Sequence, residues 1–501
     1  MKDVVSVAQM RESDEQAIRS GTPAEELMMR AARGVFSAYP WRGRVAIVCG
    51  SGNNAGDGYA LALLLRGAGI SCRVLRLVDA ASSTGLVYLE KCREVGIPIE
   101  LLSAVPDFSG DAEIADCIFG TGFRGRADGF CARVIEAINR SGLPVISVDI
   151  NSGMNGDSGL GDPTVRSTLT VSVGTPKVGH YLADAKDRVG KLCNVDIGIP
   201  IVGKPYRLLE MADVKAVFPH RLRNSHKGTY GYVGILGGSV RYAGAAKLAN
   251  LGASALRAGC GVVSLGVPAS VASSVSPYLL ESTLAPLPDR NGCMTYDPAS
   301  LDDFLAGKRA VAVGMGWGNS ADYPAILTHI LKRFGGSILL DADALNTLAG
   351  MDLNLLRSTS GRVILTPHPK EFERISGHSV AEILSDPVRT ARSFASEYGV
   401  TLLLKGATTV VTDGEEVYLS DRGCAGMATA GSGDVLSGIL VGLLGSQSPT
   451  AFTTACGAYL AGLAGELAEA EGNAVGMIAS DTVRTIPLAI SKIMTYRPEN
   501  P

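Results

Sequence analysis

Residues 44–58 read RVAIVCGSGNNAGDG, and this stretch decides the fold of the first half of the chain. Its apolar part, 44–50, has the length of a buried strand, and the glycine-rich part leads directly into the apolar helical run YALALLLRGAG (59–69). A strand that turns through glycines into a helix is the repeating unit of open α/β sheets. Because such sheets bind ligands outside the carboxyl ends of their strands, this turn is a candidate ligand site.

The turn fits neither of the two common phosphate-binding motifs. It lacks the spacing G-x-G-x-x-G, and it lacks the Gly-Lys-Ser/Thr of a Walker loop. Asn53, Asn54 and Asp57 instead add side-chain oxygens, which suit a hard cation or a ribose. On the pattern alone, a glycine-rich turn capped by Asx side chains is an equal alternative.

Outward from this turn, short apolar strands alternate with helical stretches along the whole chain. The alternation predicts an α/β protein whose parallel sheets are covered on both faces. A capping box at Thr22-Pro23-Ala24-Glu25 predicts a helix start. The segment 199–224 has prolines but no strong periodicity, and it separates two predicted domains, 1–215 and 220–495. The strands are expected at 44–50, 72–78, 114–120, 144–150, 168–174, 191–198, 232–239, 262–267, 310–318, 337–345, 362–369 and 401–411, and a long small-residue helix at 242–259.

Length and composition limit the class of protein. A chain of 501 residues exceeds one ordinary domain, and 46 basic against 49 acidic residues leave no basic stripe for nucleic acid. The ten cysteines form no C-x-x-C pair, which favours thiols in a reducing compartment. We find no signal-peptide pattern and no apolar run long enough to span a bilayer. A cytoplasmic protein without nucleic-acid or membrane partners is expected.

Polar residues follow several strands of the first half. Asn54, Asp116 and Ser152 follow three of them, and carboxyl ends of parallel strands share one edge of a sheet. Each residue alone is more often a cap, but together they predict an oxygen-lined cation site. Asp149 and Asp57 would lie beside it.

The first half carries four motifs that form a set: GSGNNAGDG (50–58), FGTGFRG (119–125), VDINSGMNGDSG (148–159) and GTPKVGH (174–180). As a set they resemble the NAD(P)H-hydrate epimerase domain over about residues 1–215, with the three-layer Rossmann-like fold of that family. Ala55 stands where the family usually has glycine, and Asn151 where it usually has proline. Neither departure removes a polar group.

The resemblance implies interconversion of the R and S forms of hydrated NADH or NADPH around a K⁺ ion. K⁺ would contact Asn54, Asp116 and Ser152. Burial raises the pKa of a carboxyl group toward working pH, which suits proton transfer at C6, with Asp149 as first candidate and Asp57 as second. A domain of this fold that binds nucleotides or RNA without catalysis is the alternative. By the resemblance, the dinucleotide would lie on Asn53, Asn54, Ala55, Gly56, Asp57, Gly120, Thr121, Gly122, Phe123, Arg124, Gly125, Arg126 and Asp149.

In the second half, AGMATAGSGDVLSG (425–438) places one acid, Asp434, between a glycine turn and an apolar helix. The free N–H groups at a helix start attract an anion, and Asp434 could take a proton from an acceptor hydroxyl. A simple helix cap is the alternative for this motif taken alone.

Other strand ends of the second half carry further candidates. Lys405-Gly-Ala-Thr-Thr409 could position phosphates, and His368 between two prolines is a candidate ligand. The turn GMGWG (314–318) would admit a bulky ligand, while Asp341 and Asp343 could bind Mg²⁺ or water. A solvated turn and a structural histidine are the alternatives.

These motifs, with HKGTYG (226–231) and GGSVRYAGAAKLA (237–249), resemble the ribokinase-like fold and its ADP-dependent NAD(P)H-hydrate dehydratase branch over about residues 220–495. Lys370 stands where the family usually has glycine, which affects the turn and not His368. The resemblance implies that ADP dehydrates the S hydrate to NAD(P)H, AMP and phosphate, with Asp434 as base and Mg²⁺ at the phosphates. ADP would contact Lys405, Gly406, Ala407, Thr408, Thr409 and Gly433, and the hydrate would contact Ala245, Gly316, Gly318, His368 and Asp434.

The two resemblances together predict a bifunctional nicotinamide repair enzyme whose ligands are NADHX, NADPHX and ADP. Two rivals stay open at this point. A kinase of a vitamin-like alcohol would form a stable phosphate ester, and a nucleotide-sensing scaffold would need no base. We also expect a homo-oligomer.

Overall fold

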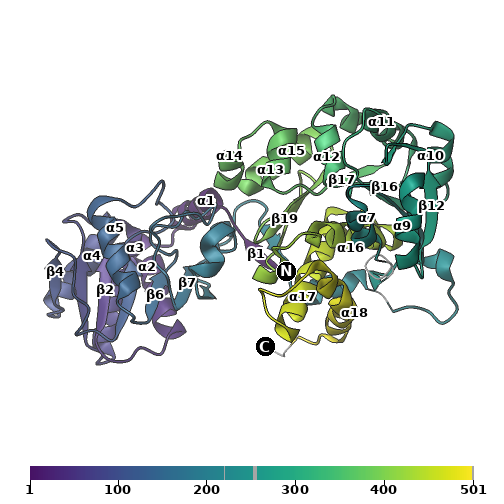
Figure 1. The fold of residues 1–501 in the computed structure, drawn as a ribbon. Helices are drawn as coiled ribbons and strands as arrows, with labels where there is room; N and C mark the ends of the chain where they lie inside the picture. The colour runs from purple at the N-terminus through teal and green to yellow at the C-terminus, as the bar shows by residue number, and fades with distance from the viewer. Residues whose placement is uncertain (219, 252–256, 499–501) are drawn as a thin grey trace. The chain divides into compact units, whose positions relative to one another are not determined.

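The computed structural model describes residues 1–218, 220–251 and 257–498, and the chain divides into two units (Figure 1). One unit is Asp3–Tyr206, and the other is Arg207–Pro501 together with Met1–Lys2. The division falls inside the predicted seam 199–224, but the second unit begins earlier than the expected residue 220. The reason is a short strand, β9 (Tyr206–Leu208), which pairs with the C-terminal sheet. None of the described helices is long and apolar enough to cross a membrane.

The N-terminal unit is built on one seven-stranded sheet in the described residues, and every neighbouring pair of its strands is parallel, as predicted. The central strands are paired in register from Val45 with Glu113 to Cys49 with Cys117. The sheet order is β4 (Ile99–Leu101), β3 (Cys72–Arg76), β2 (Val45–Cys49), β5 (Glu113–Cys117), β6 (Val145–Val148), β7 (Leu169–Val173) and β8 (Lys191–Val195).

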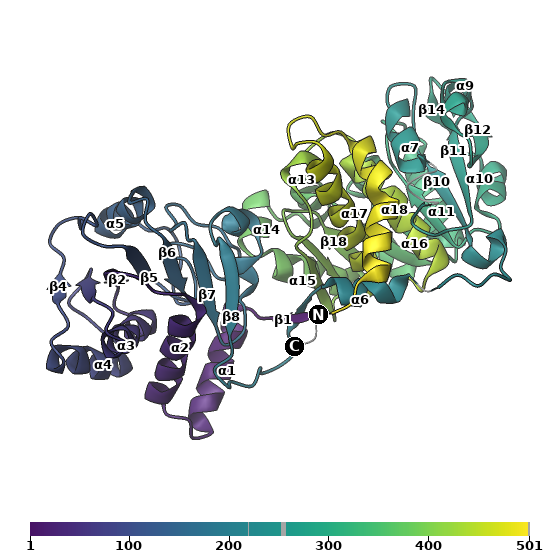
Figure 2. The same ribbon diagram turned by 90° about the horizontal axis from the view of Figure 1, so that it is seen from below.

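Helices cover both faces of this sheet, which confirms the three-layer prediction (Figure 2). α2 (Ala24–Ala38), α3 (Asn53–Gly67) and α4 (Ser83–Glu94) bury their apolar residues on one face. α5 (Gly129–Arg140) packs on the other face. Each face therefore removes a continuous apolar surface from water, which is the main source of stability for such layers.

Two local predictions at the N-terminus were wrong. Helix α1 (Val7–Arg19) was missed, although Ser6 caps it by accepting a hydrogen bond from the N–H of Gln9 at 3.1 Å. The expected capping box does not form, because α2 begins at Ala24 with Pro23 as its N-cap and without a side-chain cap bond. Pro23 holds the extended backbone that precedes the helix, and its ring has no oxygen that could accept from the first N–H groups.

The C-terminal unit contains an eleven-stranded sheet in the described residues. Parallel pairing, which the alternation of strands and helices predicts, holds for most of this sheet, but β19 (Thr409–Thr412) is antiparallel to both of its neighbours, β18 (Thr401–Leu404) and β20 (Val417–Ser420). The segment expected as one strand, 401–411, reverses direction between Leu404 and Thr409. The sheet order is β1 (Lys2–Val4), β9, β20 (Val417–Ser420), β19 (Thr409–Thr412), β18 (Thr401–Leu404), β17 (Arg362–Leu365), β16 (Ser337–Leu340), β15 (Ala310–Val313), β10 (Tyr232–Leu236), β11 (Val262–Pro268) and β12 (Thr283–Leu287).

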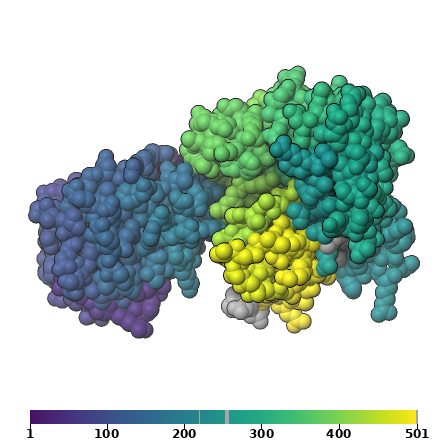
Figure 3. Space-filling model, viewed as in Figure 1, coloured from purple at the N-terminus to yellow at the C-terminus, as the bar shows by residue number. Residues whose placement is uncertain are grey.

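Two groups of helices enclose this sheet, and side chains fill the space between the ribbons (Figures 1 and 3). One face carries α7 (Ala243–Asn250), α16 (Ser432–Ser446), α17 (Ala451–Glu471) and α18 (Ala479–Thr495), whose apolar residues share one core with the central strands. The helix expected at 242–259 ends at Asn250, and residues 252–256 of that prediction lie outside the described residues. The other helices are α10 (Pro298–Leu305), α11 (Tyr323–Arg333), α12 (Asp343–Leu348), α13 (Pro369–Ser376), α14 (Val380–Ser385), α15 (Pro387–Tyr398) and the short α6 (Met211–Val214) and α9 (Ala272–Val275), and a small hairpin joins β13 (Asp289–Arg290) to β14 (Cys293–Met294).

Candidate functional sites

A cavity of about 770 Å³ opens at the carboxyl ends of β2, β5, β6 and β7 in the N-terminal unit. This is the position where open α/β sheets bind ligands. Helices α1 and α2 form its other wall, through apolar residues such as Met10 and Leu27. The predicted residues that line it are Asn53, Asn54, Asp57, Gly120, Thr121, Gly122, Phe123, Arg124 and Asp149.

Four predicted contact residues are not among the residues that line this cavity. Ala55 lies in the first turn of α3 and is fully buried in the core, and a side chain on Gly56 would collide with the Met28 thioether, 2.4 Å away. Gly125 is a turn residue with φ of 82°. Arg126 pairs with Asp162 at 3.2 Å, and both side chains are exposed. These residues shape the loop and helix that hold the site.

The three predicted cation ligands are joined by hydrogen bonds to one another or to the backbone of Phe119. Asp116 is fully buried and accepts hydrogen bonds from Ser147 Oγ at 2.7 Å and from the N–H of Ser152 at 2.9 Å. Ser152 Oγ accepts from the N–H of Phe119 at 2.8 Å, and Asn54 donates to the carbonyl of Phe119 at 2.7 Å. This leaves the buried Asn54 Oδ1 without a hydrogen-bond partner. An unpartnered buried oxygen beside other oxygen groups fits a hard monovalent cation.

Asp149 lies against Lys177 at the cavity wall. The two side chains form an ion pair, and Lys177 Nζ also donates to the carbonyl of Val173 at 2.7 Å. Asp149 has φ of 65°, a left-handed conformation that non-glycine residues adopt at a cost of about 1–2 kcal/mol. Strain of this kind persists where the surrounding structure holds it, often at a functional site.

Two further carboxyl groups face the same cavity. Burial and the nearby Asp149 raise the pKa of Asp57 well above its ordinary value. Burial also raises the pKa of Asp14 to about 6, although Lys177 opposes this shift. A raised pKa favours the protonated form of both groups, which a proton donor at this site would need. Asp14 was missed by sequence reasoning because α1 was missed, and its signal was the capping residue Ser6.

In the C-terminal unit, Asp434 lies in the first turn of α16, as predicted from GSGD. Gly431, with φ of 93°, caps the helix in a conformation that favours glycine, and no side-chain cap is present. Burial, and then the negative charge of Asp341, raise the pKa of Asp434 to about 7, with Lys405 acting in the opposite direction. A carboxylate that only caps a helix would be expected to stay ionised. The raised pKa of Asp434 instead favours a base that titrates at working pH.

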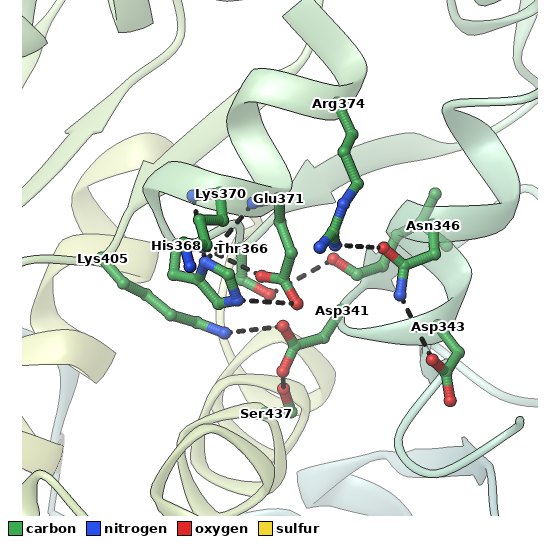
Figure 4. A network of polar contacts seen from close by, with 11 residues as sticks. Asp341, Asp343, Asn346, Thr366, His368, Lys370, Glu371, Arg374, Lys405 and Ser437 are labelled. Carbon is green, nitrogen blue, oxygen red and sulfur yellow. Dashed lines mark hydrogen bonds and ion pairs between the residues drawn. The ribbon is translucent and has the colours of Figure 1, made fainter. Parts of the chain in front are cut away.

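Beneath this turn, three side chains form a chain of polar contacts (Figure 4). Asp341, at the end of β16, accepts from Lys405 Nζ at 2.6 Å and from Ser437 Oγ at 2.7 Å. Asp341 is almost fully buried. Both of its oxygens are engaged, so it is a weaker Mg²⁺ candidate than the sequence suggested. A Cβ on Gly433 would lie 3.4 Å from Lys405 Nζ, which places the ammonium directly beside the helix start.

His368 is the N-cap of α13, and its Nδ1 accepts from the N–H groups of Lys370 and Glu371 at 3.1 and 3.3 Å. In return, the Glu371 carboxylate accepts a hydrogen bond from the backbone N–H of His368 at 3.0 Å (Figure 4). The imidazole is 47% exposed, and its Nε2 lies 3.5 Å from Glu371 Oε1, so a ligand at this edge would share the ring with Glu371. Lys370 contributes only its backbone to this turn, which explains why glycine is not required there.

The glycine turn 314–318 is packed closely against the start of α7. A Cβ on Gly316 would lie 2.6 Å from the carbonyl of Tyr242 and 2.8 Å from the Cβ of Ala245. The N–H of Gly318 donates to Asp343 at 2.8 Å, so this acid, which Figure 4 also shows, holds the turn. The glycines bring the backbone near the predicted hydrate contacts without filling the space with side chains.

The predicted nucleotide turn forms the hairpin between β18 and β19. Lys405 leaves β18 with its N–H bonded to the carbonyl of Pro367 at 2.9 Å. Thr408 is buried, and Gly406 allows a close approach to its carbonyl. Ala407 lies between them, and Thr409 begins β19.

The described residues hold no group of three or more His, Cys, Asp or Glu side chains arranged for a metal ion. A divalent ion in the C-terminal unit would therefore rely on oxygens from a bound phosphate as well as on the protein. This agrees with the usual mode of Mg²⁺ binding, in which phosphates and waters supply most ligands.

Two α/β units, each with a carboxyl group of raised pKa at the carboxyl edge of its sheet, define a two-site enzyme built on nucleotide-binding folds. A family model described as NAD(P)H-hydrate dehydratase matches residues 233–488, and one described as YjeF-related protein N-terminus matches residues 24–179. The bifunctional NAD(P)H-hydrate repair enzyme Nnr of Moorella thermoacetica is 36% identical over 90% of this chain and 88% of its own length. That of Coxiella burnetii is 32% identical over 94% and 96%. The chain belongs to the family of bifunctional NAD(P)H-hydrate repair enzymes.

One solved structure of an NAD(P)H-hydrate dehydratase is similar to the C-terminal unit. The ADP/ATP-dependent NAD(P)H-hydrate dehydratase from Bacillus subtilis, co-crystallised with ATP and Mg²⁺, is 29% identical, with a TM-score of 0.50. The match covers 57% of this chain and 99% of that chain. A ribokinase-like superfamily protein from Enterococcus faecalis, 22% identical with the same TM-score, confirms the ribokinase-like fold.

Proposed function

We propose that the two sites act in turn on hydrated NADH and NADPH, the N-terminal site as epimerase and the C-terminal site as dehydratase. The observation that carries this proposal is Asp434, whose pKa is raised to about 7 at the anion-attracting start of α16. A kinase of an alcohol would use the same base, but membership of the repair-enzyme family favours the hydrate.

At the C-terminal site, Asp434 takes the proton of the C6 hydroxyl while that oxygen attacks the terminal phosphorus of ADP and AMP leaves. The C6–O bond of this phosphate ester then breaks, and phosphate departs as the ring nitrogen lone pair moves toward C6. Loss of the C5 proton restores the C5–C6 double bond. Lys405 and the N–H groups of the first turn of α16 stabilise the transferring phosphoryl group. Mg²⁺, bound with the nucleotide, would neutralise phosphate charge.

The rest of this site holds the two substrates. We assign the nucleotide to the hairpin Lys405–Thr409 and to Gly433, and the hydrate to Ala245, Gly316, Gly318 and His368. The His368 side chain is 47% exposed, and Gly316 and Gly318 add no side chains, which leaves room for a dinucleotide. The Bacillus subtilis enzyme is an ADP/ATP-dependent dehydratase, and we propose ADP as the co-substrate here.

Three carboxyl groups at the N-terminal site can move protons as the bond between the ring nitrogen and C6 opens and recloses. They belong to Asp57, Asp14 and Asp149. The raised pKa values of Asp57 and Asp14 favour their protonated forms, so we assign the proton donor to these two groups ahead of Asp149, which is paired with Lys177. This reverses the order expected from the sequence. K⁺, held by Asn54, Asp116 and Ser152, would supply positive charge that orders the loop around Phe119.

One assay tests both assignments. An R/S mixture of hydrated NADH is incubated with ADP and Mg²⁺, and the return of reduced-nicotinamide absorbance is followed. Full recovery supports both sites, whereas a stop at the S fraction, after correction for spontaneous epimerisation, would remove the epimerase. Asp434→Asn should abolish recovery and leave R-to-S conversion intact, and Asp57→Asn should do the opposite. A stable phosphate ester of a vitamin alcohol would instead identify a kinase.

We also propose a cytoplasmic location, which the lack of any C-x-x-C pair in the sequence favours. A homo-oligomer stays a prediction that sedimentation of the purified chain tests.

A further inference from the structure

His180 is a buried titratable group that the proposed reaction does not use directly. It lies in the short helical turn Val178–His180 that follows β7, and 2% of its surface is exposed. Both ring nitrogens are hydrogen-bonded. Nδ1 is 3.1 Å from the backbone nitrogen of Lys177, and Nε2 is 2.8 Å from the carbonyl oxygen of Asp149.

The chemistry of these two partners determines where the ring proton is. A backbone N–H can only donate, so Nδ1 must be the unprotonated acceptor. A carbonyl oxygen can only accept, so Nε2 must carry the hydrogen. A protonated ring would place an N–H against the N–H of Lys177. Burial, together with the Lys177 ammonium, also lowers the pKa of His180 to about 4, although the Asp149 carboxylate opposes this shift.

The two bonded groups belong to the two members of one ion pair. Asp149 is the strained residue with φ of 65°, and its side chain pairs with Lys177 at the cavity wall. The backbone of Asp149 is further held by its N–H, bonded to the carbonyl of Val171 at 2.8 Å, and its Oδ1 accepts from the N–H of Val173 at 3.2 Å. His180 supplies the bond on the opposite side of this residue, to its carbonyl.

We infer that His180, as the neutral Nε2–H tautomer, is a positioning residue that joins the main chains of Asp149 and Lys177 and so fixes their ion pair in the epimerase cavity. This inference rests on the proposed function of the N-terminal site. Without the ring, the carbonyl of Asp149 and the N–H of Lys177 lose their partners, and the left-handed residue can relax. A displacement of about 1 Å at a reacting group can lower a rate by about a hundredfold.

Two variants separate the two hydrogen bonds. In His180→Asn the side-chain oxygen can take the place of Nδ1 but the amide cannot reach Asp149. In His180→Gln the terminal amide can take the place of Nε2 and donate to the Asp149 carbonyl. We expect the epimerase kcat to fall about 10- to 100-fold in the Asn variant, with KM changed less than about threefold, and to be partly restored in the Gln variant. The matched control is His329→Asn, which removes another buried histidine, bonded to Asp302 at 2.9 Å in the C-terminal unit.

Activity is measured as conversion of the R to the S hydrate by chromatography, and thermal unfolding of each variant checks that it is folded. Wild-type kcat in His180→Asn, or an equal loss in His329→Asn, would overturn the inference. So would a loss that appears only in KM.

A spectroscopic readout is independent of activity. Long-range ¹H–¹⁵N spectra of the ¹⁵N-histidine-labelled chain, with the His180 signal assigned by its absence in His180→Asn, should show a neutral Nε2–H ring at pH 6. An imidazolium or an Nδ1–H tautomer would overturn the inference even if the epimerase works. If the wild type does not epimerise but the Nε2–H ring is found, the proposed function fails while the two hydrogen bonds of His180 to Asp149 and Lys177 stand. Failure of the proposed function is therefore distinguishable from failure of the inference about His180.

Discussion

Replacing Asp341 by asparagine should lower the pKa of Asp434 and shift the dehydratase pH profile toward acid. The pKa of Asp434 is raised from 3.8 to about 7, and after burial the largest cause is the charge of Asp341. Asp341→Asn removes that charge and leaves an oxygen that can still accept from Ser437. Lys405 keeps its positive charge and, without its partner, favours the ionised form of Asp434 more strongly.

The size of the shift follows from the geometry. Ser437 is three residues after Asp434 on α16, so their side chains are neighbours about 5–6 Å apart, and Ser437 Oγ is 2.7 Å from Asp341. The two carboxylates are thus separated by roughly 7 Å. At an effective dielectric constant of about 20, their repulsion is roughly 2.4 kcal/mol, or somewhat under two pKa units. We therefore expect the apparent pKa to fall by about one to two units.

The assay is the rate of ADP-dependent dehydration of the S hydrate between about pH 5.5 and 8.5, under single-turnover conditions so that product release does not mask the base. In the wild type the rate should rise through about pH 7, because Asp434 acts in its ionised form. In Asp341→Asn the rise should come at lower pH, although the plateau can drop because Lys405 is less well held.

Ser437→Ala is the control, because it removes the hydrogen bond to Asp341 without changing any charge. Its profile should stay within a few tenths of a pH unit of the wild type. An unchanged or higher apparent pKa in Asp341→Asn, with the variant folded, would refute the electrostatic account and the assignment of Asp434 as the titrating base.

Three other outcomes are expected. The pKa of Asp434 is about 7 in the folded state and 3.8 in the unfolded state, so the ionised acid destabilises the fold most at high pH. Asp434→Asn should therefore stabilise the fold by up to about 4 kcal/mol at pH 8 and by less than half of that at pH 5. Thermal unfolding at the two pH values measures this difference. If K⁺ activates the epimerase as proposed, Asn54→Ala should weaken this activation about tenfold or more without affecting dehydration, and an unchanged K⁺ titration would exclude Asn54 as a ligand. Gly316→Ala should lower the dehydratase kcat/KM about tenfold or more, because the new Cβ would lie 2.6 Å from the Tyr242 carbonyl. Gly307→Ala is the control, since Gly307 has a similar φ of 70° and no atom within 4 Å of the new Cβ. This variant should lower stability only.

The pattern of the sequence was sufficient for the parts of the fold that depend on neighbouring residues. Apolar runs such as 44–50 and 310–313 became buried strands, because a strand covered on both faces needs nothing but apolar side chains. The start of α16 at GSGD was also predictable, since a left-handed glycine and free N–H groups are local features. The reversal at Lys405–Thr408 was not, because TLLL and TTVV look the same whether they pair in parallel or antiparallel.

The sequence by itself determined which chemical groups stand near the strand ends and helix starts: Asn54 and Asp116 in the first half, Lys405 and Asp434 in the second. Only the tertiary structure decided how they act. Asp341 lies 96 residues before Ser437 and 64 before Lys405, yet it contacts both and raises the pKa of Asp434. In the same way α1 brings Asp14 to Asp57, and His180 reaches back to Asp149. Burial and the distance between charges set the pKa of each group, and both quantities exist only when segments far apart in the chain are packed together.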